Sequence, residues 1–141
     1  AQDRARELAS IKRKIVKIDP AFAPAIKNLE PCTFGLTKPT VTSYQSLIRS
    51  VVAQQVSTAA ARTISGRLEV KCGGSITAEK VGALSLKQLQ SVGLTGAKVR
   101  TISELTAAAL SGGINFRKFP HLSDEEIIQE VLPLYGIGRW T

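Results

Sequence analysis

Residues that carry metal and disulfide chemistry are scarce in this sequence. Its 141 residues include two cysteines and one histidine, and no Cys-x-x-Cys motif or Cys/His cluster connects them. Cys32 and Cys72 are therefore not expected to form a disulfide framework or a metal site, and isolated thiols are typical of a reducing, intracellular compartment. His121 follows a proline and has no partner in sequence, so we do not expect it to act as a general base.

The N-terminal stretch lacks an uninterrupted apolar run. AQDRARELASIKRKIVKI, residues 1–18, mixes charges of both signs into its first turns. A secretory signal or a membrane span needs a longer apolar segment, so neither is expected. Period-two alternation, internal repeats and low-complexity tracts are missing as well, which favours helices over strands.

Positive charge is what the sequence has in excess. Nineteen Lys and Arg residues against 11 Asp and Glu residues give a formal net charge of +8. This excess favours a polyanionic partner, with a merely soluble basic surface as the alternative. The densest cluster, Lys12 to Lys14, fits the solvated face of a helix.

Apolar residues at helical spacing predict an amphipathic helix at the start of the chain. The stripe consists of Leu8, Ile11, Ile15 and Ile18. We expect this stripe to pack on a core and the helix to end at Asp19-Pro20, because proline cannot continue the hydrogen bonding of a helix. A short helix over residues 22–29 and the loop EPCTFGLTKPT, residues 30–40, are predicted to follow.

A series of further helices completes the predicted all-α fold, which we expect to form a single domain over residues 1–141. These helices are predicted over residues 44–55, 58–71, 77–83, 85–92, 97–110 and 124–131. Ser43 and Ser57 are the expected N-caps of the first two, and Ser123 with Glu126 has the capping-box spacing at the last. The residues of the first helix that are expected in the core are Leu47, Ile48, Val51 and Val52.

The sequence ends with a hairpin motif, LPLYGIGRWT, residues 132–141. A helix leads into Gly136-Ile137-Gly138, and Arg139 is expected to open another helix. The glycines allow a left-handed backbone or the close approach of a ligand, and Ile137 can fill the space between the two helices. Free N–H groups at the start of the second helix would form a phosphate site that positions a protein on DNA without reading bases. A tight turn without a ligand is the alternative.

Three segments of the sequence carry a family resemblance. They are YQSLIRSVVAQQVSTAAARTISGRL (residues 44–68), VGLTGAKVRTISELTAAALSGGI (92–114) and LYGIGRWT (134–141). In this order they resemble the helix-hairpin-helix DNA glycosylases, and among them the 3-methyladenine DNA glycosylase II family, which removes alkylated bases. The resemblance, which begins near residue 19, implies double-stranded DNA with alkylated bases as the partner and action as a monomer without a required cofactor. An intracellular location, in the cytoplasm, nucleoid or nucleus, is expected with it.

In that family a turn between two helices, here Ala53 to Ser57, enters the minor groove and fills the gap left by a flipped nucleotide. The resemblance makes Gln54 and Gln55 the probing residues, with Gln55 at the wedge position. Base flipping suits this chemistry because the glycosidic bond cannot be reached inside the base stack. The alternative is that both glutamines only satisfy a turn.

The hairpin residues take their roles from the same resemblance. The DNA-contacting set is Gly136, Ile137, Gly138 and Arg139. Trp140 stands where strand-cleaving relatives carry a nucleophilic lysine, so a Schiff-base lyase is not expected. In the alkylation-repair branch this tryptophan lines the base pocket, where an aromatic face attracts a cationic purine; a core tryptophan that anchors the hairpin is the alternative. A monovalent cation that bridges to a DNA phosphate could bind the carbonyls of Leu132, Leu134 and Ile137.

The matched segments contain no catalytic residue. The family's aspartate, which stabilises the positively charged sugar and assists water attack, lies beyond the second hairpin helix, and this sequence has no residue after Thr141. Asp3, Asp19 and Asp124 precede the hairpin and match no motif. We therefore expect a C-terminally incomplete, monofunctional glycosylase that is inactive as this chain alone. A truncated DNA-binding module without catalysis is the second hypothesis.

Overall fold

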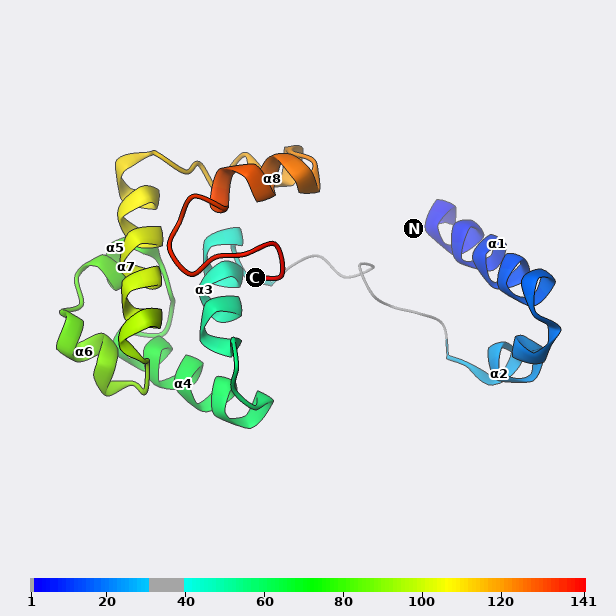
Figure 1. Cartoon of the computed structure of the whole chain (residues 1–141), viewed down its shortest axis with the longest axis horizontal. Coiled ribbons are helices and arrows are strands. Elements are labelled where there is room, and N and C mark those ends of the chain that lie inside the picture. The colour runs from blue at the N-terminus through cyan, green and yellow to red at the C-terminus, as the bar shows by residue number, and fades with distance from the viewer. Residues whose placement is uncertain (1, 31–39) are drawn as a thin grey trace. The chain divides into compact units, whose positions relative to one another are not determined.

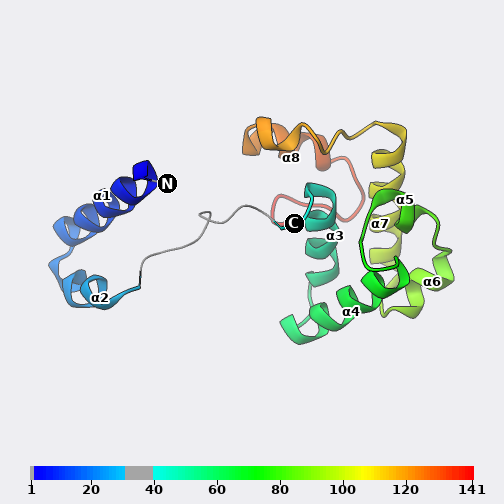
Figure 2. The same ribbon diagram turned by 180° about the vertical axis from the view of Figure 1, so that it is seen from behind.

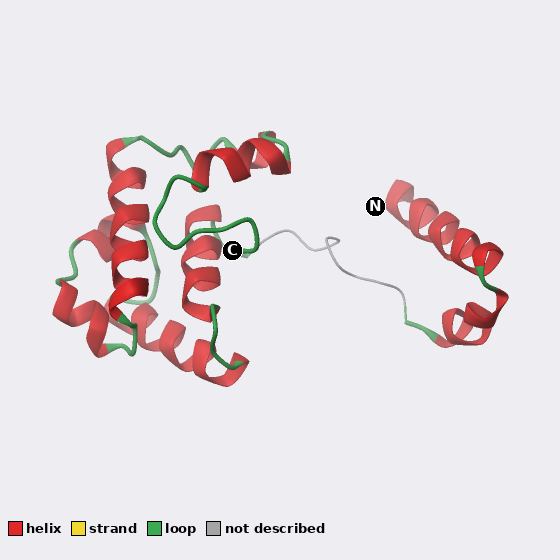
Figure 3. Ribbon diagram, viewed as in Figure 1, coloured by secondary structure: helices red, strands yellow, loops and turns green. Residues whose placement is uncertain are grey.

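The computed structural model describes residues 2–30 and 40–141, in two compact units, Ala1–Thr40 and Val41–Thr141. Every regular element in the described ranges is helical (Figure 3), which confirms the predicted all-α fold class. Cys32 and most of the predicted 30–40 loop lie outside the described residues. The two units are described one at a time, and the single domain expected over residues 1–141 stays a prediction.

The first unit contains α1 (Gln2–Ile18), the 3-10 turn η1 (Pro20–Phe22) and α2 (Ala23–Asn28) (Figure 1). α1 ends where predicted, because Asp19 takes an extended backbone and its carboxylate accepts the N–H of Ala21 at 2.9 Å. None of residues 6–30 is buried, and Ile18 of the predicted stripe is 85% exposed. The expected packing of this stripe on a core therefore stays a prediction.

The second unit is a cluster of helices around α7. Its elements are α3 (Ser43–Ala53), α4 (Thr58–Lys71), α5 (Ala78–Gly82), α6 (Leu86–Ser91), α7 (Gly96–Ser111), the 3-10 turn η2 (Phe119–His121) and α8 (Asp124–Val131). α7 packs against α3, α5 and α6, and α3 packs against α4 (Figures 1 and 2). The helix bounds lie within two residues of the predicted ones, whereas η2 was not predicted.

Side-chain caps fix where these helices begin. Ser57 caps α4, and Ser123 with Glu126 forms the predicted capping box at α8. The prediction for α3 was wrong by one residue: Thr42, not Ser43, is the N-cap, and its hydroxyl accepts the N–H of Gln45 at 3.2 Å. Both residues can cap a helix, but it is Thr42 that takes the extended backbone a cap requires, and Ser43 is already helical.

The core of this unit lies where the apolar faces of α3, α4 and α7 meet. Its fully buried residues include Ile48, Val51, Val52, Leu68, Ile102 and Leu105, each at 0% exposure. Leu47 is half-buried and packs against this cluster, so the predicted apolar face of α3 is confirmed. Cys72 is buried and free, as expected of a structural thiol, and burial raises the pKa of its thiol.

One buried polar pair crosses the core. The hydroxyls of Tyr44 on α3 and Thr106 on α7 lie 2.8 Å apart, and the Thr106 hydroxyl donates to the Ile102 carbonyl at 2.6 Å. Burial raises the pKa of Tyr44 from 10.0 to about 12, although the bond to Thr106 acts in the opposite direction. The pair joins the two helices that carry the site described below.

Replacing Tyr44 by phenylalanine tests this pair. Because Thr106 keeps its bond to Ile102, Tyr44→Phe should lower the free energy of unfolding by only about 1 kcal/mol in urea denaturation at neutral pH. Above pH 10 the unfolded wild-type chain loses the phenol proton that the folded chain retains toward pH 12, so wild-type stability should fall as the pH rises. The variant should lack this part of the alkaline slope, and equal slopes would show that Tyr44 is not buried as described.

Candidate nucleic-acid interface

The turn after α8 is fastened to α7 through Tyr135. Its backbone N–H donates to the Glu104 carboxylate at 3.1 Å, and the Arg100 guanidinium lies 3.9 Å above the centre of its ring. Arg100 also donates to Glu104 at 2.8 Å, and this bond is the chief reason that the pKa of Glu104 is lowered. The turn at Tyr135 is thereby held beside α7, and the segment then runs back across α3 to the C-terminus (Figures 1 and 2).

The two glycines of the hairpin have different surroundings. Gly136 has φ +72°, and a Cβ atom there would collide with the hydroxyl of Thr101, a buried residue of α7. Ile137 is buried in the core cluster, and its predicted place between two hairpin helices stays a prediction. Gly138, by contrast, has open space where a Cβ would stand. Gly136 is therefore required by packing on α7, whereas Gly138 leaves room for a ligand.

The hairpin leaves fewer free N–H groups than the motif suggested. Ile137 donates to the Leu134 carbonyl at 3.2 Å, and Gly138 donates to the Thr141 hydroxyl at 3.0 Å. The N–H groups of Arg139 and Trp140 have no partner among the described residues. The predicted second helix is represented by one turn, closed by the bond from Thr141 N–H to the Gly138 carbonyl at 2.9 Å. An anion at this turn would meet the N–H groups of these two residues.

The loop between α3 and α4, residues 54–57, places Gln55 at an exposed position. Gln55 has φ +55° and is the one non-glycine residue with a positive φ in the described ranges. It makes no side-chain hydrogen bond within those ranges. A left-handed backbone is uncommon for a residue with a side chain, so the surrounding contacts must hold this loop in its shape.

Gln54, its neighbour, faces the protein. Its Nε2 atom donates to the Gly136 carbonyl at 3.1 Å and to the Thr141 hydroxyl at 3.0 Å. The side chain thus joins the 54–57 loop to the hairpin, across more than 80 residues of sequence. The structure brings both predicted DNA-contacting segments together, but it gives the two glutamines opposite surroundings.

Lys98, in the first turn of α7, also contacts this region and was not singled out from the sequence. Its Nζ atom donates to the carbonyls of Val52 and Gln54, each at 2.7 Å. These carbonyls belong to the end of α3, where helical carbonyls lack partners and a cation is favourable. Burial lowers the pKa of Lys98. A lysine near a helix start resembles any solvated cation in sequence, so the pattern gave no signal of this contact.

Arg139 is paired within the protein. Its guanidinium donates to both carboxylate oxygens of Glu125, at 3.3 and 2.8 Å, and both side chains are more than half exposed. This pairing is the chief reason that the pKa of Glu125 is lowered, so the carboxylate stays charged until the pH falls below its ordinary range. A phosphate would have to compete with Glu125 for Arg139, which the sequence pattern did not reveal.

Trp140 is fully exposed, at 101% of its reference area. It therefore does not anchor the hairpin in the core, which removes the alternative considered from the sequence. Its ring contributes nothing to the packing of the hairpin and is free to contact a ligand, while the base pocket expected around it stays a prediction.

Two of the three carbonyl groups predicted to hold a cation flank the hydrogen-bonded turn of the hairpin. The Leu134 carbonyl accepts the Ile137 N–H at 3.2 Å, and a carbonyl oxygen with two lone pairs can still accept a second partner. The cation site at Leu132, Leu134 and Ile137 stays a prediction. No group of three or more His, Cys, Asp or Glu side chains suited to a metal ion occurs in residues 2–30 and 40–141.

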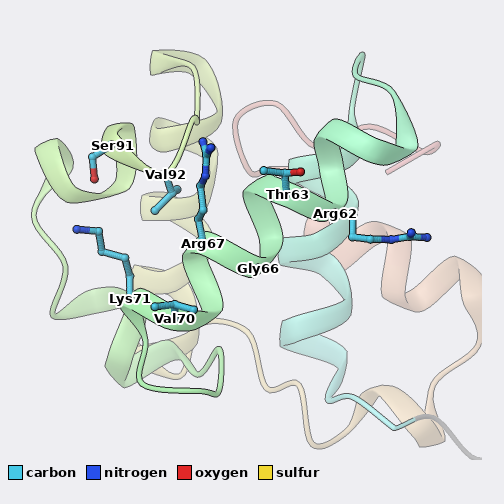
Figure 4. A pocket seen from close by; sticks show the side chains of 8 residues that line it. All are labelled: Arg62, Thr63, Gly66, Arg67, Val70, Lys71, Ser91 and Val92. Carbon is cyan, nitrogen blue, oxygen red and sulfur yellow. The ribbon is translucent and has the colours of Figure 1, made fainter.

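A groove of about 420 Å³ lies along α4 and the end of α6. Arg67 and Lys71 extend on the side of Ser91 and Val92, whereas Arg62 extends the opposite way (Figure 4). The groove is mainly apolar and its cations belong to α4, outside the hairpin and the 54–57 loop. Its cationic side chains can be compared with those of the interface.

No helix within the part of the chain that the structure describes is both long and apolar enough to cross a membrane.

Known proteins similar to this chain are DNA glycosylases. No protein-family model matches the chain. Over 101 residues, 70% of the chain, it is 31% identical to DNA-3-methyladenine glycosylase 1 of Schizosaccharomyces pombe and covers 44% of that protein. It is 24% identical to the alkylbase DNA glycosidase-like protein mag2 of the same yeast, over 92% of the chain and 62% of that protein.

Solved structures lead to the same class. The 3-methyladenine DNA glycosylase of Schizosaccharomyces pombe in complex with abasic DNA superposes with a TM-score of 0.66 and 27% identity, over 74% of this chain and 53% of that one. A DNA-3-methyladenine glycosidase from Bacillus halodurans gives a TM-score of 0.69 and 28% identity, over 89% and 57%. The predicted resemblance to helical DNA glycosylases is thus confirmed. The chain spans about half the length of the relatives it matches.

The different surroundings of the two glycines can be tested by alanine substitution. Gly136→Ala should lower the free energy of unfolding by about 2 kcal/mol or more, because it adds a side chain at positive φ against Thr101. Gly138→Ala should change it by less than about 0.5 kcal/mol, since the space is open and the backbone is not strained. Urea denaturation measures both, and equal destabilisation by the two variants would contradict the described packing.

Proposed function

We propose that this chain is the DNA-contacting part of a monofunctional DNA glycosylase that flips and hydrolytically removes alkylated bases, of the 3-methyladenine and 7-methylguanine class. The names of its relatives support the class of reaction. The relative in complex with abasic DNA supports DNA as the partner, and an abasic site is what base removal leaves behind. The chain acts as a monomer and needs no cofactor for hydrolysis in this proposal.

The observation that carries the proposal is the meeting of two loops. The 54–57 loop offers the exposed Gln55 side chain, and the hairpin offers the free N–H groups of Arg139 and Trp140. Gln54 joins them directly. In the proposed complex Gln55 enters the minor groove as the wedge that replaces a flipped nucleotide, and the hairpin binds a phosphate of the same duplex. A monovalent cation at the hairpin carbonyls would add to that phosphate contact.

Trp140 is the proposed contact for the flipped base. Its ring is free of other contacts, and an aromatic face attracts a cationic alkylated purine more strongly than a neutral one. No lysine occupies this position, so a Schiff base with the sugar is not part of the mechanism. Water replaces the base at the sugar carbon, which makes the enzyme monofunctional.

The catalytic aspartate that the resemblance implies matches none of the aspartates of this chain. In the proposal this chain therefore binds DNA but does not release bases by itself. A DNA-binding module without catalysis uses the same loops, so binding is the property to test first.

Binding to two duplexes, one intact and one with an abasic site, tests the proposed contacts. Gln55→Ala should reduce the preference for abasic DNA and leave the salt dependence unchanged, because the side chain is uncharged. Arg139→Gln should weaken binding to both duplexes and reduce the slope of log K against log salt by about 0.9, the value for one phosphate. Fluorescence anisotropy at several salt concentrations measures both effects.

Arg67→Gln is the matched control, because it removes the same charge from the groove on α4. If it weakens binding as much as Arg139→Gln does, affinity comes from net charge alone. Equal loss on both duplexes for Gln55→Ala would contradict the wedge assignment.

The pairing of Arg139 with Glu125 leads to a separate prediction. Glu125→Gln removes the carboxylate that competes with phosphate, so it should raise affinity for both duplexes and make binding more salt-dependent. Glu130→Gln is the control, because Glu130 is an exposed residue of α8 without a salt bridge in the described ranges. The same anisotropy titration measures both. If Glu125→Gln and Glu130→Gln raise the affinity equally, the effect comes from net charge alone. If Glu125→Gln lowers the affinity, Glu125 instead orients Arg139 toward DNA.

A further inference from the structure

The side chain of Gln54 has no donor left for DNA. A glutamine amide has two N–H donors, and those of Gln54 are directed at the Gly136 carbonyl, 3.1 Å away, and the Thr141 hydroxyl, 3.0 Å away. The Gly136 carbonyl can only accept, which fixes which end of the amide faces the hairpin. A Gln54 side chain that probed a base would have to break both bonds.

The backbone at Gln54 is held as firmly as its side chain. Lys98 donates to the carbonyls of Val52 and Gln54 at 2.7 Å each, so a side chain of α7 holds the end of α3. Two segments far apart in sequence therefore meet at Gln54, which the hairpin holds through the amide and α7 holds through the carbonyl. The next residue, Gln55, then turns outward with φ +55°.

Thr141 completes the arrangement from the hairpin side. Its hydroxyl oxygen accepts from Gln54 Nε2 at 3.0 Å and from the Gly138 N–H at 3.0 Å. The bond from Gly138 is the second bond, beside that from the Thr141 N–H to the Gly138 carbonyl, across the single turn that presents the N–H groups of Arg139 and Trp140. Gln54 thus contacts the hairpin on both sides of this turn, at the Gly136 carbonyl and at the Thr141 hydroxyl that accepts from Gly138.

From these contacts we propose that Gln54 is a positioning residue, which locks the hairpin to the 54–57 loop so that both meet DNA as one preformed surface. This inference rests on the proposed function for its DNA consequence and replaces the probing role considered for Gln54 in the sequence. Gln55 alone probes the duplex. A preformed surface binds more tightly because less conformational entropy is lost on association.

Amide hydrogen exchange in the DNA-free chain tests the lock. In Gln54→Ala the amides of Ile137 and Gly138 should exchange about tenfold faster, the effect expected from losing hydrogen bonds that hold the turn. Gln55→Ala is the matched control, a neighbouring glutamine without such bonds, and should leave these rates unchanged. Unchanged rates in Gln54→Ala would overturn the proposal.

DNA binding separates positioning from a merely structural role. At a temperature where the variant is folded, Gln54→Ala should weaken binding to intact and abasic duplexes by a similar factor of about five to ten, whereas Gln55→Ala should mainly reduce the abasic preference. Wild-type affinity for both duplexes in a folded Gln54→Ala variant would reduce Gln54 to a stability residue. A selective loss of abasic preference would restore its probing role, and either result overturns the proposal.

Two substitutions at Thr141 test the bond to Gln54 from the hairpin side, one that keeps the hydroxyl and one that removes it. Thr141→Ser keeps the hydroxyl that accepts from Gln54 and should behave as wild type, whereas Thr141→Val removes it and should loosen the hairpin. The effects of Thr141→Val and Gln54→Ala should combine to less than their product, because they break a shared bond. Independent effects would contradict the lock.

The proposed function fails separately from this inference. If wild-type chain shows no preference for abasic DNA and Arg139→Gln has no effect on binding, the DNA role is wrong. The exchange rates of the hairpin amides still decide in that case whether Gln54 holds the hairpin.

Discussion

The contact of Gly136 with Thr101 is the constraint on which the rest of the interface depends. A hairpin can lie this close to α7 only where one residue has no side chain and tolerates φ +72°. With the turn packed against α7, Ile137 lies in the core and the Tyr135 N–H donates to Glu104. The Gly136 carbonyl is then within hydrogen-bond distance of Gln54. The glycine thus acts through packing inside the protein, and it is Gly138 that leaves space on the open side.

Charge is used in two different ways around this turn. Lys98 donates hydrogen bonds to carbonyl groups at the end of α3, where its partly buried charge stabilises the loop. Arg139 is exposed and held by Glu125, an ion pair of a kind that contributes little to stability in water. A net charge of +8 therefore does not measure how many cations are ready for phosphate. Lys98 is hydrogen-bonded to backbone carbonyls, and Arg139 must first break its ion pair with Glu125.

Local sequence signals predicted the helices well, because caps and apolar spacing act over a few residues. Ser57, Ser123 and the stripe of α3 are examples. The family resemblance assigned both glutamines of the 54–57 loop to DNA contact, and this assignment stays a prediction. What distinguishes Gln54 from Gln55 is a bond to residues more than 80 positions away and the backbone angle at one residue. Neither this bond nor this angle can be predicted from the spacing of neighbouring residues. The same holds for the contacts of Lys98 and for the pairing of Arg139 with Glu125.

The central claim is that the 54–57 loop and the hairpin contact DNA together. Hydrogen exchange of the chain with and without an excess of abasic duplex tests it most directly, since it reports protection along the whole backbone in one experiment. The account predicts that protection appears in residues 54–57 and 136–141 at once, while the groove residues Arg67 and Lys71 of α4 stay unchanged. Protection centred on α4, or on one of the two loops without the other, would contradict it.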